Sequence, residues 1–142
     1  MANNDITSAN ASLTITSPTA GNCNVTKFAA DGLLDAEPRT LAETRMTLDG
    51  NLLAGYVPAI RRVTIHLEAT SNGIPFLMAL KLTSDAAKSP IPVILTVTVP
   101  SQGKRYVATG FMTQCPEMPN LGTTVQPMDF VFECQDIVPV SI

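Results

Sequence analysis

Charged side chains are scarce in this sequence of 142 residues. Asp, Glu, Lys and Arg make up 15% of it, whereas apolar residues make up 45%. An average soluble domain has roughly 25% charged residues, so this surface must be rich in uncharged polar and apolar groups. Such a surface favours association between copies. The net charge is -3 and no run of Lys or Arg is present, which argues against a nucleic-acid-binding protein.

The three cysteines, Cys23, Cys115 and Cys134, cannot all pair in disulfides. The first residues have neither the basic region nor the apolar core of a secretory signal. We therefore expect a reduced intracellular protein whose thiols pack as small apolar groups. No apolar run approaches the roughly 20 residues that a membrane-spanning helix needs. We accordingly expect a soluble protein with no membrane partner.

Reactive groups are too few and too scattered for a recognisable active site. The single histidine, His66, lies on the polar side of an alternating segment. Neither a metal-binding Cys-x-x-Cys or His-x-x-x-His pair nor a glycine-rich phosphate loop is present. We therefore expect no enzymatic activity, no metal and no cofactor. The alternatives are a catalytic His66 or a zinc site that joins it to the three cysteines, and both would require the fold to gather distant residues.

Alternation of apolar and polar residues predicts most of the secondary structure. The clearest case is the segment 62–68, where Val63, Ile65 and Leu67 share one face of a half-buried strand. Further strands are expected at residues 13–16, 25–28, 45–48, 93–99, 105–113 and 128–134, with loops at 29–43 and 116–127. Helical spacing predicts one helix after Ser71 or Asn72, with an apolar face made of Ile74, Leu77, Met78 and Leu82.

These elements predict a mainly β fold in a single domain that spans residues 1–142. We expect an antiparallel β-sandwich or barrel of six or seven strands with one short helix. Its parts would be a flexible N-terminal arm at 1–11, a long hairpin at 44–68 with an apolar loop at 49–60, a short helix at 72–88 and C-terminal strands at 92–138. A monomer has little reason to display the apolar loop, so we interpret it as a contact for a second copy of the chain.

Three stretches follow one another in a recognisable order. The first joins residues 46–50 to residues 63–67 through the long loop, and the second is the turn and helix at 71–80. The third runs from the strand at 93–99 through the polar loop at 116–120 to the apolar strand at 125–132. In order and spacing, these stretches resemble the tail tube proteins of bacteriophages with contractile tails, and more distantly the tube of the type VI secretion system.

This resemblance implies a structural virion protein of the phage tail, with a tail-tube fold and a stacking hairpin. Hexameric rings would stack into a helical tube, assembled in the host cytoplasm, that conducts phage DNA into the host cell. Its partners would be other copies of the chain, the tail sheath protein, the baseplate and tail terminator proteins, and DNA that passes without specific binding. Closure of a barrel across subunits would pair the open strand edges, and an acidic chain would let DNA slide.

The residues of the apolar loop are our candidates for ring stacking: Leu52, Leu53, Tyr56, Val57 and Ile60. The alternative is that these side chains fold back on their own core. Candidates for a surface that faces the lumen are Glu68, Asp129 and Glu133, with the outer surface of the wall as the alternative. Two other functions stay open: a tail terminator, tube initiator or baseplate hub protein of the same fold, and a small β-sandwich binding module, which the lack of Trp disfavours.

Overall fold

The computed structural model describes residues 10–19, 21–29 and 32–142 of the chain. The predicted N-terminal arm at 1–11 lies almost entirely outside the described residues. The described elements are β1 (Ser12–Ser17), β2 (Gly21–Val25), β3 (Leu34–Ala36), β4 (Ala42–Met46), β5 (Leu52–Tyr56), β6 (Arg61–Leu67), α1 (Gly73–Ala87), β7 (Pro92–Val99), a 3-10 turn (Pro100–Gln102), β8 (Lys104–Gln114) and β9 (Met128–Ser141).

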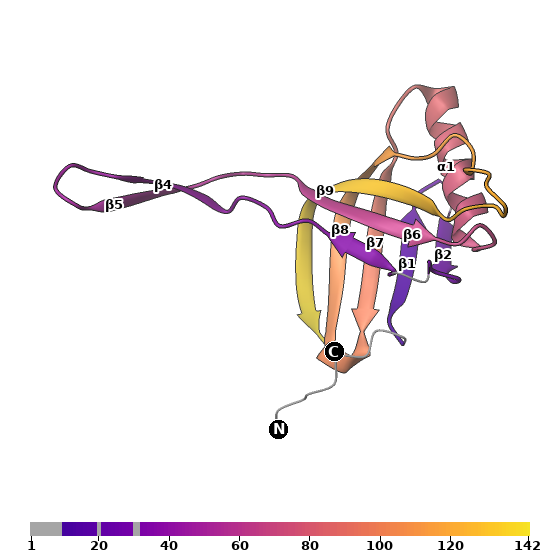
Figure 1. Cartoon of the computed structure of the whole chain (residues 1–142), viewed down its shortest axis with the longest axis horizontal. Helices are drawn as coiled ribbons and strands as arrows, with labels where there is room; N and C mark the ends of the chain where they lie inside the picture. The colour runs from indigo at the N-terminus through magenta and orange to yellow at the C-terminus, as the bar shows by residue number, and fades with distance from the viewer. Residues whose placement is uncertain (1–9, 20, 30–31) are drawn as a thin grey trace.

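The fold is mainly β, as predicted, with one helix and a large antiparallel sheet. Seven strands form this sheet in the order β2-β1-β7-β8-β9-β6-β3, and β4 and β5 form a separate hairpin. Figure 1 shows the sheet curling around its inner face, with α1 at one end and the β4–β5 hairpin projecting away from the opposite side. The described residues thus contain nine strands, whereas the sequence predicted six or seven.

The segment between β2 and β3 connects the two edges of the sheet. Phe28 forms an isolated antiparallel bridge with Leu67 at the end of β6. The backbone N–H of Ala29 donates to the carbonyl of His66 at 3.2 Å, and the N–H of His66 donates to the carbonyl of Leu33 at 3.0 Å. The sheet is therefore a partly closed barrel, because the chain that leaves one edge hydrogen-bonds to the other.

The core lies on the concave side of the sheet. Val63, Ile65 and Leu67 are buried there, which confirms the predicted inner face of β6. Phe130 and Phe132 of β9 are fully buried opposite them. The core is completed by Leu13, Ile15, Val25, Val93, Leu95, Ala108, Met128, Cys134 and the helix residues Leu77 and Leu80.

Helix α1 is joined to β2 by the residues at its start. The side-chain oxygen of Asn72 accepts a 2.8 Å hydrogen bond from the Thr26 N–H, and its amide donates to the Asn24 carbonyl. Ser71 Oγ, one residue before the N-cap residue Asn72, accepts from the Gly73 N–H at 3.2 Å and so satisfies one free amide of the first turn. Leu82, predicted on the apolar face, is exposed instead. In the described part of the chain, no helix combines the length and the apolar character needed to cross a membrane.

Strand β9 continues seven residues beyond the predicted end at Cys134. Its register with β8 shifts by one residue between the pairs Thr109–Asp136 and Gly110–Cys134, so Gln135 is an extra residue in a bulge. The bulge reverses which residues point inward. Before it, the even-numbered residues of β9 are buried, whereas after it the odd-numbered Ile137 packs against the core. The period-two pattern in the sequence therefore breaks at 135, and the rest of the strand was missed.

Other strand predictions were wrong in position or pairing. A strand was predicted at 25–28, but the strand in this region is β2, which ends at Val25. The extended chain stops there because Lys27 adopts a left-handed φ of 58°. The predicted loop at 29–43 contains β3 and the start of β4. The predicted hairpin at 44–68 implied that its two outer segments pair, but β4 pairs with β5, and β6 pairs with β3 and β9. The predicted apolar loop at 49–60 contains strand β5.

Candidate assembly surface

The β4–β5 hairpin owes its geometry to a compact five-residue turn. The Thr47 N–H donates to the Asn51 carbonyl at 2.9 Å, and the Gly50 N–H donates to the Thr47 carbonyl at 3.1 Å. Gly50 has a φ of 91°, a conformation that glycine adopts at little cost. Hydrogen bonds lower the pKa of the Asp49 carboxyl below its ordinary value, and the bond from the Thr47 hydroxyl has the largest effect. The turn is thus a well-satisfied polar structure at the far end of the hairpin.

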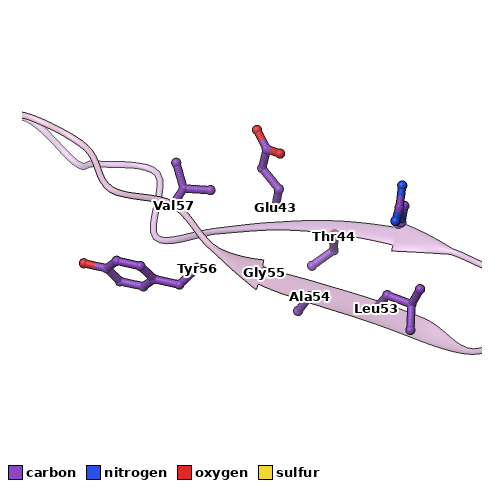
Figure 2. Close-up of a pocket in the computed structure, with 8 residues that line it drawn as sticks. Glu43, Thr44, Leu53, Ala54, Gly55, Tyr56 and Val57 are labelled. Carbon is purple, nitrogen blue, oxygen red and sulfur yellow. The ribbon is translucent and has the colours of Figure 1, made fainter.

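The two faces of the hairpin differ in chemistry. In the β4–β5 register, Met46 lies opposite Leu52 and Ala42 lies opposite Tyr56, so these residues share one face, which is uncharged. The other face carries Glu43 and Arg45 together with Leu53. Figure 2 shows this division near the root, where Glu43 and Val57 point to one side of the ribbon and Tyr56 points to the other.

The structure places the five predicted stacking residues on this hairpin and at its root. Leu52, Leu53, Tyr56 and Ile60 are exposed, with 63% of Leu52 and 66% of Tyr56 accessible, and Val57 is half-buried. They do not fold back on the core, so the alternative interpretation of these residues is wrong. They do not form one continuous face either, since Leu53 lies on the charged side of the hairpin. Sequence reasoning missed Met46, which is about as exposed as Leu52, and Leu48, which is more exposed than either, because both fell inside a predicted strand.

Two depressions accompany these residues. One, of about 430 Å³, lies along the hairpin and is lined by Glu43, Arg45, Leu53, Tyr56 and Val57 among others (Figure 2). A second, of about 520 Å³, lies at the root of the hairpin. It is bounded by Tyr56, Pro58 and Ile60 on the hairpin side and by Phe111 and Gln135 of the sheet. The hairpin and the adjoining sheet together therefore present a concave surface with exposed apolar side chains.

The predicted lumen candidates lie on or near the outer face of the sheet, where basic partners neutralise two of them. Glu133 forms a 2.7 Å ion pair with Arg62 across the β6–β9 pair. Asp129 accepts from His66 Nδ1 at 2.7 Å, and Asp35 accepts from His66 Nε2 at 2.8 Å. Glu68 follows the end of β6, and its N–H donates to the Lys27 carbonyl. The three candidates therefore do not form a shared acidic surface.

His66 connects three strands through these two hydrogen bonds. Both ring nitrogens face carboxylates, so only the doubly protonated imidazolium can donate to both. The hydrogen bond to Asp129 raises the pKa of His66 most strongly, the Asp35 carboxylate also raises it, and partial burial opposes them. This arrangement joins β3 to β9 through β6. In the described residues, His66 is therefore part of an ion-pair cluster, and no group of three or more His, Cys, Asp and Glu side chains is arranged to hold a metal.

We expect His66 to stabilise the fold more at acidic pH than at alkaline pH. Its pKa is higher in the folded state, so its contribution is complete below about pH 6.5 and is lost as the pH rises through the folded-state pKa. The effect should be about 1 kcal/mol or less, because Asp35 and Asp129 are largely exposed. Urea unfolding of the wild type and His66→Gln at pH 5.5 and 8.5 measures it. An equal difference at both pH values would contradict the expectation.

All three cysteines have free thiols. Burial raises the pKa of each of the three thiols, including the thiol of Cys134 on the inner face of β9. Such thiols remain protonated and unreactive at neutral pH, so Cys134 packs as a small apolar side chain, as the sequence predicted.

A known protein family matches most of the chain. The search of curated proteins found no match. Among solved structures, the chain is similar to the tube-terminating cap of the anti-feeding prophage, solved by cryo-electron microscopy. The two share 8% identity with a TM-score of 0.47, over 92% of this chain and 88% of that one. The family model described as tail fiber protein gp32 matches residues 4–138. The chain therefore belongs to the tail fiber protein gp32 family and is a bacteriophage tail protein.

Proposed function

We propose that this tail protein is a non-enzymatic wall subunit of the tail tube, which forms hexameric rings that stack into a helical tube. The observation that carries the proposal is the β4–β5 hairpin, which projects from the barrel as a two-stranded ribbon (Figure 1). It has exposed apolar side chains on both faces. The rings would be assembled in the host cytoplasm and carried in the virion. A contractile sheath would surround them, and baseplate and terminator proteins would close the two ends.

An isolated two-stranded hairpin is at best marginally stable in water. In the part of the chain that the structure describes, no third strand pairs with the β4–β5 hairpin, and every residue of both strands is exposed. Packing of Leu52 against a neighbouring copy would contribute about 1.5–3 kcal/mol, as for other large aliphatic side chains. The hairpin therefore gains its stability from a second copy, which is what a ring-to-ring contact supplies.

Conduction of DNA requires a wall to which phosphates do not adhere. The outer face of the sheet meets this need where acidic and basic side chains pair, as in Arg62 with Glu133 and His66 with Asp129. No basic side chain in these pairs is left without a carboxylate. We propose that this face, which includes Asp129 and Glu133, lines the lumen in the assembled tube and that DNA passes without specific binding.

Negative-stain images of the purified protein over a range of concentrations test the proposal. A tube subunit should form hollow filaments of uniform diameter whose length increases with concentration. Single closed rings would instead favour the tail terminator, tube initiator or baseplate hub function. Solid fibrils would favour a fibre subunit, the structure that the family description names. A monomer at high concentration would contradict every one of these functions.

A further inference from the structure

The concave side of the sheet contains an apolar cavity that the core does not fill. It has a volume of about 320 Å³ and lies at the end of β7 farthest from α1. Its walls include Leu34 and Ala36 of β3, Val97 of β7, Tyr106 of β8 and Ile137 of β9. Tyr106 is 37% exposed, so part of this lining residue reaches solvent.

The lining determines what kind of group can occupy the cavity. Aliphatic and aromatic side chains surround it, and none of the described residues that line it is charged. A charged ligand, or a backbone segment with free N–H and carbonyl groups, would lose its hydrogen bonds to water there. The suitable occupant is an apolar side chain carried by a segment whose polar groups are already satisfied.

The tip of the β4–β5 hairpin has these properties. Leu48 is the most exposed large apolar side chain in the described residues, with a relative accessibility of 109%. Its neighbours bond to one another: the Asn51 N–H donates to Thr47 Oγ1 at 3.0 Å, and the Asn51 amide donates to Asp49 Oδ2 at 3.2 Å. The turn therefore presents one leucine on a scaffold with few polar groups left to satisfy.

The tip cannot reach the cavity of its own chain. The hairpin points away from the barrel along its whole length (Figure 1). Two five-residue strands carry the tip about 17 Å from the root at roughly 3.4 Å per residue. A contact between the tip of one copy and the cavity of another is heterologous, because the two surfaces differ. Heterologous contacts repeat from copy to copy and generate rings or filaments.

We propose that Leu48 of one subunit inserts into the apolar cavity of a subunit in the adjacent ring. The proposal rests on the tube function proposed above and adds the acceptor for the hairpin. Leu48 is the inserted group, and Ala36, Val97, Tyr106 and Ile137 form part of its receptor. The hairpin then makes two contacts with a neighbouring subunit. Its uncharged face packs along that subunit, and Leu48 at its tip inserts into the apolar cavity.

Photo-crosslinking tests the contact directly. The photoreactive residue p-benzoylphenylalanine replaces Leu48 in one preparation and Leu82, another exposed apolar residue, on α1, in a control preparation. Each is assembled with ¹⁵N-labelled wild-type protein, irradiated and analysed by peptide mass spectrometry. Position 48 should cross-link to heavy peptides that contain the cavity-lining residues, and position 82 should not. Cross-links from position 48 that fall elsewhere in intact assemblies would overturn the proposal.

Assembly measurements separate this proposal from the proposed function. Leu48→Ala should raise the concentration at which assembly starts about tenfold, whereas Leu48→Met should change it little. Ala36→Phe, which fills the cavity from the exposed β3 edge, should have an effect similar to that of Leu48→Ala. If wild-type assembly is lost with Leu52→Asp but unchanged with Leu48→Ala and Ala36→Phe, the cavity contact is wrong and the stacking role stands. Absence of wild-type assembly would overturn both.

Discussion

Replacement of Leu52 by Asp is expected to abolish assembly at concentrations where the wild type forms filaments. Leu52 lies on the uncharged face of the hairpin, opposite Met46. The substitution removes about 1.5–3 kcal/mol of apolar burial and places a carboxylate in an apolar contact. We therefore expect assembly to weaken by about 100-fold or more, since each 1.4 kcal/mol corresponds to about tenfold. Sedimentation velocity and negative-stain images over a concentration series measure the effect.

The fold of this variant should be unchanged, because Leu52 is 63% exposed and lies outside the core. Circular dichroism and thermal unfolding at low concentration check this. Leu53→Asp is a matched comparison on the opposite face, beside Arg45, and should weaken assembly less. Leu82→Asp on α1 should leave assembly unaltered. Normal filaments formed by Leu52→Asp would remove the hairpin from the stacking contact.

Replacement of Gly110 by Ala should be among the most destabilising single-methyl changes in the molecule. A Cβ atom at this position would lie 2.3 Å from the Glu133 carbonyl oxygen and 2.6 Å from the Cys134 Cα. These are backbone atoms at the β9 bulge, so relief requires a shift of the strand and not a rotamer change. Overpacking of this kind costs about 1–3 kcal/mol. The melting temperature should fall by roughly 4–12 °C, as measured by calorimetry.

Gly55→Ala provides the control for this prediction. Gly55 lies in the exposed strand β5, and a Cβ added there meets no atom within 4 Å. Its melting temperature should stay within about 2 °C of the wild type, because a compatible alanine has only a small effect. If Gly110→Ala melted at the wild-type temperature, the close approach of β8 to the bulge would be contradicted.

Local patterns were informative wherever a strand has one buried and one exposed face. β6 was predicted within one residue at each end, because Val63, Ile65 and Leu67 contact the core while their neighbours face solvent. Helix α1 was predicted within one residue at each end for a similar reason. In β5, by contrast, both faces are exposed. Because neither face of such a strand is buried, its sequence need not alternate between apolar and polar residues, which explains why β5 was predicted as a loop.

Pairings between distant residues could not be obtained from local patterns. Glu133 and Asp129 lie on one face of β9, as the alternation predicted, but their basic partners on β6 depend on a register between residues that are 71 and 63 positions apart. The missed part of β9 has the same cause, since the bulge at Gln135 exists only against Gly110 of β8.

Composition and periodicity alone defined a β-rich chain with one helix, a surface poor in charge and an apolar segment near residue 52. These properties depend only on residue types and on short spacings along the chain, so they can be predicted without knowing which distant residues are in contact. Tertiary contacts decided that this segment is a free hairpin, that the barrel closes through the β2–β3 connection and that Asp129 and Glu133 have basic partners. Each of these depends on which distant backbone groups meet, because strand pairing satisfies hydrogen bonds irrespective of separation along the chain.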